Sequence, residues 1–228
     1  MGQVLVRFLI ADSSVELVPR ELWEHPDVRR MGKRYGVPPS HMLLEKSLHY
    51  RAMERLPVKW KRGRPDILHV VLLNILDSPL SSRGMLEIYV HTIEGRIFWV
   101  DPRTRIPVSY ERFRGLFSQL LRLGRVPPRG SPLIREVNSS LEELVSGHPV
   151  ILLWEKGEKY KLSDFARALI NDYPGAFVII GGFPRGDYSR SVLMLPHTLR
   201  VSLFEGSPVK AWTVVSRILC SIEELLGY

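Results

Sequence analysis

The chain has few of the residues that mark several protein classes. It has one cysteine, Cys220, among 228 residues, so it can form no internal disulfide and no thiolate cluster for zinc or iron–sulfur. We therefore expect a reducing compartment such as the cytoplasm. No apolar run approaches the roughly 20 residues of a membrane span. Arg7 interrupts the first apolar run, which therefore predicts a strand rather than a signal peptide.

Side-chain amides are also scarce. The sequence has two glutamines and three asparagines against 17 prolines. Few thermolabile residues and stiff loops are typical of proteins that work at high temperature. The composition therefore suggests a thermophilic prokaryote or archaeon as the source.

Positive charge is concentrated in the middle of the chain. Residues 51–135 hold 16 lysines and arginines, 14 of them arginine, against seven acidic residues. The rest of the chain holds 16 against 17, so the excess behind the net charge of +8 lies in this stretch. Such a face favours a polyanionic partner, and the use of arginine suggests planar recognition of phosphates or bases. The alternative is a solvated basic face without a partner.

Hydrophobic patterning predicts an α/β fold. Strands are expected at residues 4–11, 150–157, 176–182 and 198–204, with a hairpin at 85–100. Helices are expected at 39–56 after Ser40, at 67–76 capped by Asp66, after Ser109, at 162–172 capped by Ser163, and from 209 onward. The alternation implies a mainly parallel sheet covered by helices on both faces, and the Pro/Gly-rich segment 123–132 is the candidate boundary between subregions.

Two glycine-containing loops follow predicted strands near the end of the chain. They are GGFPRGDYS, residues 181–189, and LFEGSP, residues 203–208. Because ligands of parallel sheets bind beyond the carboxyl ends of the strands, the two loops could line one pocket. Neither matches the standard dinucleotide or P-loop pattern, and each could instead be a turn without a ligand.

The basic middle of the chain supplies candidate recognition residues. In the GRPD turn, Pro65 restricts the backbone and Asp66 could hold Arg64 by bidentate pairing, or could only cap the next helix. Arg105 and Arg112 lie where a loop opens a helix, a place suited to phosphates, although a solvated loop is the simpler interpretation. The seven histidines show no paired ligand spacing, so we expect no metal site.

Several of these segments together resemble one known family. The stretches RGRPDILHVVLLNILDSPLSSRGMLEIYVHT, VDPRTRIPVSYERFRGLFSQLL, VIIGGFPRGD and VSLFEGSP are similar to the small-subunit ribosomal RNA pseudouridine-N1-methyltransferase family, also called the nucleolar essential protein family. The resemblance implies one SPOUT-type domain over 1–228, with a small β-rich extension at about 84–108. It also implies a C-terminal trefoil knot and a cofactor-binding portion over about 149–228, and a homodimer joined through the knot regions.

The resemblance also assigns roles to residues. It implies that S-adenosylmethionine, without a metal, is held by Leu152, Gly181, Gly186, Asp187, Leu203, Phe204, Glu205, Gly206, Ser207 and Pro208. It implies RNA contacts from Arg64, Arg105 and Arg112, with Asp66 steadying Arg64. The fixed place of Asp66 in the GRPD turn adds the hypothesis that its carboxylate is catalytic and assists removal of the N1 proton, directly or through water. Val108 stands where some relatives carry a further arginine, which Arg103 or Arg114 could replace.

The function that follows from the resemblance is methylation of a pseudouridine at N1 in small-subunit ribosomal RNA, with a role in small-subunit biogenesis. Two alternatives stay open at this point. The protein could be an RNA-binding assembly factor for which methylation is secondary. It could also be a knotted methyltransferase that acts on transfer RNA, although that reading leaves the RPD and RIP motifs unexplained.

Overall fold

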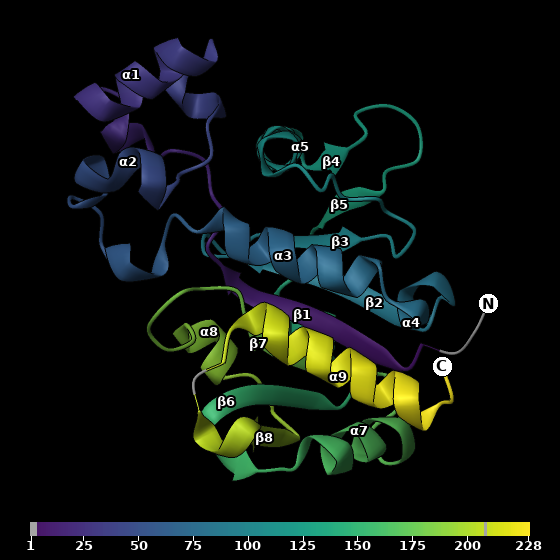
Figure 1. The fold of residues 1–228 in the computed structure, drawn as a ribbon. Coiled ribbons are helices and arrows are strands. Elements are labelled where there is room, and N and C mark those ends of the chain that lie inside the picture. The colour runs from purple at the N-terminus through teal and green to yellow at the C-terminus, as the bar shows by residue number, and fades with distance from the viewer. Residues whose placement is uncertain (1–3, 208) are drawn as a thin grey trace.

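A computed structural model describes residues 4–207 and 209–228, whose strands form one eight-stranded sheet (Figure 1). The strand order is β4-β5-β3-β2-β1-β7-β6-β8. The strands are β1 Val6–Ser13, β2 Leu86–Thr92, β3 Ile97–Val100, β4 Arg125–Val126, β5 Ile134–Val137, β6 Val150–Lys159, β7 Ala176–Gly181 and β8 Leu199–Ser202.

The sheet is parallel where the sequence predicts it. β1 runs parallel to both β2 and β7, and β6 runs parallel to both β7 and β8. The predicted hairpin is confirmed, because β2 and β3 are antiparallel. β5 and β4 continue this antiparallel part of the sheet as far as Val137, beyond the expected extension at 84–108. The segment 123–132 therefore contains a strand of the same sheet.

Helices cover both faces of the sheet, as predicted. The α-helices are α1 Pro26–Tyr35, α2 Lys46–Met53, α3 Pro65–Leu76, α4 Pro79–Ser82, α5 Tyr110–Leu123, α6 Leu141–Val145, α7 Leu162–Asn171, α8 Arg190–Leu193 and α9 Ala211–Leu225. Short 3-10 helices occupy Arg20–Leu22, Pro39–His41, Lys59–Lys61 and Phe204–Gly206. Along the described chain, no helix is both long enough and apolar enough to cross a bilayer.

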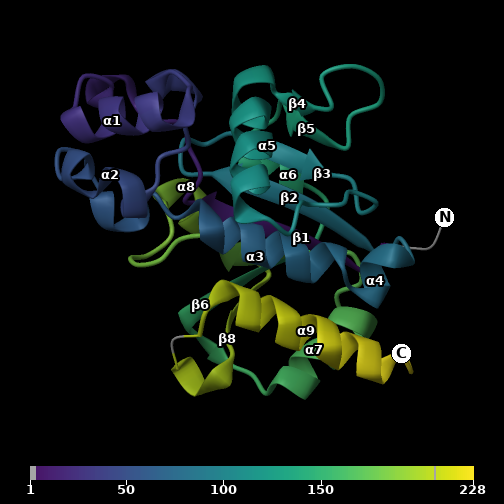
Figure 2. The same cartoon turned by 45° about the horizontal axis from the view of Figure 1, so that its top comes forward.

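Alternation along the strands decides which helices lie on which face. Phe8 and Ile10 of β1 join a core that includes side chains of α3, α5, α7 and α9, whereas Leu9 joins the opposite core with α6 and α8. Figures 1 and 2 show α3 and α9 side by side on the first face. The apolar side of α9, including Ile218 and Ile222, is buried in this core. Leu225, at the end of the same helix, is 42% exposed, and Trp212 and Val214 are partly buried.

The helix predicted at 39–56 is wrong in its first half. Residues Met42–Glu45 are extended, and their backbone pairs with the segment after β1. The Leu44 N–H donates to the Glu16 carbonyl at 3.0 Å, and the Val18 N–H donates to the Met42 carbonyl at 2.9 Å. This long-range pairing overrides the helical spacing of the apolar residues. Within the predicted range 39–56, the α-helix is limited to α2.

Three predicted helix caps also differ from the structure. Asp66 lies inside the first turn of α3, which Arg64 caps, and its carboxylate pairs with Arg64 instead. Ser109 is the N-cap of α5 but makes no side-chain capping bond. The N-cap of α7 is Lys161 rather than Ser163.

The helices α1 and α2 form a separate small cluster beside the sheet. Their buried side chains, such as Val28, Met31 and Met53, pack on one another rather than on the main core. In Figure 1 this cluster stands apart from the strands, above the end of the sheet where β7 and α8 meet. The trefoil knot implied for 149–228 stays a prediction.

Candidate functional site

A cavity of about 640 Å³ lies at the carboxyl ends of β7 and β8, against the second half of β6. The loop after β7 and the loop after β8 both line it, so the two glycine-containing loops found in the sequence share one cavity. The start of α9 closes another side with Lys210 and Trp212. Arg64 and Ile67 reach it from the beginning of α3. The cavity therefore brings the tail of the chain together with the GRPD motif.

The loop after β7 passes very close to β1. The Gly182 N–H donates to the Ala11 carbonyl at 2.8 Å, and the Gly182 carbonyl accepts from the Ser14 N–H at 2.9 Å. A Cβ at Gly182 would lie 2.6 Å from Ser13 Oγ and 2.8 Å from Ser13 Cα, which leaves no room for a side chain. Gly182 thus lets the loop leave the sheet directly above β1.

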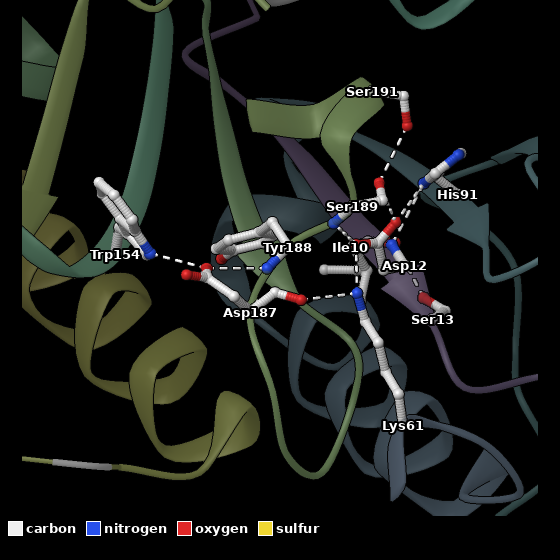
Figure 3. A network of polar contacts seen from close by, with 10 residues as sticks. All are labelled: Ile10, Asp12, Ser13, Lys61, His91, Trp154, Asp187, Tyr188, Ser189 and Ser191. Atoms are coloured by element: carbon white, nitrogen blue, oxygen red, sulfur yellow. Dashed lines mark hydrogen bonds and ion pairs between the residues drawn. The ribbon is translucent and has the colours of Figure 1, made fainter. Parts of the chain in front are cut away.

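Asp187 fixes the far end of this loop to β6. Its Oδ1 accepts from Trp154 Nε1 at 2.8 Å (Figure 3). Its Oδ2 accepts from Lys156 Nζ at 3.1 Å. Burial raises the pKa of Asp187, but hydrogen bonds from the Tyr188 N–H, Lys156 and Trp154 outweigh it and hold that pKa below its usual range. The carboxylate therefore stays ionised at neutral pH.

A buried polar network lies behind the same loop (Figure 3). Asp12, in the left-handed region at φ 50°, accepts from Lys61 Nζ at 2.7 Å. It also accepts from Ser189, through the backbone N–H at 2.6 Å and through Oγ at 2.8 Å. Its own N–H donates to His91 Nδ1 at 3.1 Å. Burial lowers the pKa of His91 and outweighs the nearby Asp12 carboxylate, which favours the neutral ring.

Arg64 and Asp66 form the pair predicted from the GRPD motif. Arg64 Nε donates to Asp66 Oδ1 at 2.8 Å, and Nη2 donates to Oδ2 at 2.7 Å. This bidentate bonding raises the Arg64 pKa further. The Arg64 backbone N–H donates to Ser14 Oγ at 2.9 Å, which ties the motif to the end of β1. Arg64 is one of the described residues that line the cavity and Asp66 is not, although the Asp66 side chain is 40% exposed next to it.

Glu45 is a buried carboxylate close enough to this pair for the Asp66 charge to act on it. Glu45 accepts from the Tyr110 hydroxyl at 2.9 Å and pairs with Arg114 at 3.2 Å. Burial raises the pKa of Glu45, and burial together with the Glu45 charge raises that of Tyr110. Arg114 is 21% exposed and committed to these contacts, so it is poorly placed to replace an arginine at position 108.

The other predicted RNA contacts are on the surface. Arg105 and Arg112 are exposed, and so is Val108, at 81%. Arg103 is also paired, with Asp101 at 2.6 Å, but its side chain is 85% exposed. By exposure it is a better candidate than Arg114 for the contact missing at Val108, and this role stays a prediction.

The predicted cofactor residues divide into two groups. Gly181, Gly186, Asp187, Leu203, Phe204 and Ser207 line the cavity. Leu152 has a fully buried side chain in the core on the other face of the sheet, and its neighbour Leu153 reaches the cavity instead. Glu205 and Gly206 are in the short helix after β8, and Glu205 is not among the described residues that line the cavity. Pro208 lies outside the described residues.

Sequence reasoning missed several residues of the site. Trp154 and Lys156 belong to β6, whose apolar first residues predict a buried strand and give no sign that the following residues line a cavity. Lys61 and Trp60 come from a short 3-10 helix, and Trp60 is 55% exposed beside Gly186. Asp12 follows the first apolar run of the chain. A polar residue directly after a buried strand was the signal that could have identified it.

Comparison with known proteins identifies the family. A family model described as EMG1/NEP1 methyltransferase matches residues 8–223. "Ribosomal RNA small subunit methyltransferase Nep1" of Aeropyrum pernix is 48% identical over 223 residues, which cover 96% of this chain and 98% of that protein. The protein of the same name from Staphylothermus marinus is 43% identical over 225 residues, 96% of each chain.

A solved structure supports the same assignment. The crystal structure of Archaeoglobus fulgidus Nep1 bound to S-adenosylhomocysteine superposes with a TM-score of 0.86 at 36% identity, over 100% of both chains. Similarity therefore extends along the whole chain in both sequence and fold. The chain belongs to the EMG1/NEP1 methyltransferase family.

Proposed function

We propose that this protein transfers a methyl group from S-adenosylmethionine to N1 of a pseudouridine in small-subunit ribosomal RNA. The observation that carries the proposal is the position of Arg64, which lines the cavity formed by the two glycine-containing loops. The GRPD motif, which the resemblance assigns to RNA binding, thus borders the cavity expected to hold the cofactor. Family membership and the ligand of the Archaeoglobus fulgidus structure support the choice of cofactor.

The cavity residues suit this cofactor. A volume of about 640 Å³ lies within the range of pockets for ligands of this size. Apolar Leu203 and Phe204 would hold the adenine, and Lys210 and Arg185 would hold the carboxylate of the methionine part. Gly181 keeps the wall thin, because a Cβ there would lie 2.9 Å from the Phe183 ring. When bound, the cofactor supplies an electrophilic methyl group on a sulfonium.

The residues of the chain then have to bring the base to that group. Positioning alone can account for much of the rate enhancement, because the loss of translational and rotational entropy has already occurred when both reactants are bound and aligned. Arg64 would contact the target nucleotide or its phosphate, and the two bonds from Asp66 keep its guanidinium in one orientation. A base flipped out of a single-stranded loop could enter here and be read at its edge.

Asp66 is the candidate for the proton at N1. Each of its oxygens accepts one bond from Arg64 and keeps a second lone pair, so the carboxylate could accept the N1 proton directly or through water. Asp66→Asn should therefore reduce methylation far more than it weakens cofactor binding. Full methylation rates and full RNA affinity in this variant would remove Asp66 from the mechanism.

RNA binding beyond the target base is assigned to the exposed arginines. Arg105 and Arg112 lie in the basic middle of the chain and would neutralise phosphates next to the target loop, and Arg103 would supply the contact missing at Val108. Such contacts fix the register of the RNA without reading its sequence.

The decisive experiment is mass spectrometry of ribosomal RNA after incubation with the protein and isotopically labelled S-adenosylmethionine. The expected product carries one labelled methyl group on a pseudouridine of small-subunit RNA. Label in transfer RNA would favour the knotted transfer-RNA enzyme instead. Tight ribosomal RNA binding without any label would favour an assembly factor that does not need methylation, and would refute the proposed reaction.

The remaining family features are also proposals for this chain. We propose a homodimer in the cytoplasm, a role in small-subunit biogenesis, and a trefoil knot within 149–228. Met194, directly after α8, is 69% exposed, and Leu225 of α9 is 42% exposed, so both are candidates for the subunit contact. Light scattering of the purified protein tests the dimer, and a monomer over the working concentration range would contradict it.

A further inference from the structure

Lys61 lies where the RNA-side segment meets the loop of the cofactor cavity. Its ammonium donates to Asp12 Oδ2 at 2.7 Å and to the Asp187 carbonyl at 2.8 Å (Figure 3). It also lies 4.2 Å from the centre of the Phe183 ring, a cation–π contact. The Lys61 side chain is 8% exposed, and that of Asp12 is 3% exposed. Two of the three partners belong to the loop after β7.

Asp12 extends the connection to the end of that loop. Besides Lys61, it accepts from the Ser189 N–H at 2.6 Å and from Ser189 Oγ at 2.8 Å. Lys61 and Asp12 together therefore hold the loop at Phe183, at Asp187 and at Ser189. The same loop carries Gly181 and Gly186, which line the cavity.

The other side of Lys61 is tied to the RNA motif. Only two residues separate it from Arg64, and both are held in place. Arg62 forms a bidentate pair with buried Glu16, and the Gly63 carbonyl accepts from the Lys46 N–H at 2.8 Å. Lys61 and Arg64 therefore lie on one short, anchored segment, which fixes their positions relative to each other.

We propose that Lys61 is a positioning residue that couples the cofactor loop to Arg64, so that cofactor and RNA each strengthen the binding of the other. The inference rests on the proposed function, because it assigns the two ligands to the two sides of Lys61. A cofactor that orders the loop after β7 also fixes Lys61, and through it Arg64. By thermodynamic reciprocity, RNA bound at Arg64 must then raise cofactor affinity by the same factor.

The test is a binding cycle on the full-length protein. S-adenosylhomocysteine is titrated by calorimetry with and without a pseudouridine-containing oligoribonucleotide, and the RNA is titrated with and without S-adenosylhomocysteine. Wild-type protein is expected to show the same enhancement in both directions, in the usual range of roughly 5- to 150-fold. In Lys61→Met the factor should fall close to one, with each ligand still bound alone.

Lys59→Met is the matched control. Lys59 lies on the same short helix, is partly exposed and pairs with exposed Glu54. It removes the same charge from the same helix without touching the loop, so the enhancement factor should stay at the wild-type value. Loss of coupling in both variants would mean that general charge, rather than the contacts of Lys61, carries it, and would overturn the inference.

Other outcomes are equally decisive. Undiminished coupling in folded Lys61→Met would overturn the role of Lys61 and leave the proposed function standing. Wild-type protein that binds both ligands without coupling would do the same, whereas wild-type protein that binds neither would refute the proposed function itself. If Lys61→Met does not fold, Ser189→Ala decides, because it removes one bond to Asp12 and keeps the backbone bond. It should reduce the coupling factor, and an unchanged factor would refute the connection.

Discussion

A methyl group added at Gly186 tests whether the loop after β7 is shaped for the cofactor. The backbone there has φ +99°, and a Cβ would lie 3.2 Å from Trp60 Nε1. A side chain held in such a conformation costs about 1–3 kcal/mol. If Gly186→Ala relaxes by moving the loop, that energy has to be restored on binding. Since about 1.4 kcal/mol is a factor of ten, cofactor affinity should fall roughly 5- to 150-fold.

Calorimetric titration with S-adenosylhomocysteine measures this loss, and Gly147→Ala is its control. Gly147 has φ +77°, its Cβ would meet nothing within 4 Å, and it lies in the turn before β6, outside the cavity. It should lower the free energy of unfolding by a similar amount and leave affinity unchanged. Wild-type affinity in Gly186→Ala, with or without lowered stability, would refute the claim that this glycine shapes the site.

Three further predictions concern acid stability, RNA binding and the proton at N1. Burial lowers the pKa of His49 to about 4. The free energy of unfolding is therefore highest above the ordinary pKa near 6.5 and falls by about 3 kcal/mol as the pH drops toward 4. His49→Asn should make the free energy of unfolding depend less on pH over this range in denaturant titrations, and an unchanged pH dependence would contradict the prediction. Arg105→Ala should weaken RNA binding and its salt dependence by about one phosphate contact while sparing cofactor binding, whereas Arg167→Ala on α7 should change neither. Asp66→Asn should lose its rate most strongly at low pH if Asp66 takes the proton, which a pH–rate profile of single-turnover methylation would show, and parallel profiles would refute it.

Much of the fold follows from local pattern. The strands at β1, β6 and β7 are short apolar runs rich in branched residues, and such runs are buried on both faces of a parallel sheet. The cavity loops were predictable for the same reason, because glycines after a buried strand lie at the edge where ligands bind. Only Pro65 lies between Arg64 and Asp66, so this pair could be predicted from the local sequence.

The parts that could not be predicted depend on contacts between distant residues. The extended segment Met42–Glu45 has helical apolar spacing, and only its pairing with the segment after β1 keeps it out of a helix. Lys61 meets Asp12 across 49 residues and the Asp187 carbonyl across 126. A single sequence does not show which distant residues come into contact, so the polar network behind the loop after β7 could not be predicted.

The buried pair of Lys61 and Asp12 is better explained by orientation than by stability. Removing two charges from water costs several kcal/mol per ion, and apolar residues of similar volume often stabilise a protein as well or better. Asp12 also has left-handed backbone geometry, which adds to the cost. What an apolar pair could not do is hold a backbone carbonyl, a backbone N–H and an aromatic ring of one loop in fixed directions at once. The Lys61–Asp12 pair at the end of β1 therefore fixes the shape of the loop after β7 relative to Arg64. The proposed alignment of two substrates requires such a fixed arrangement.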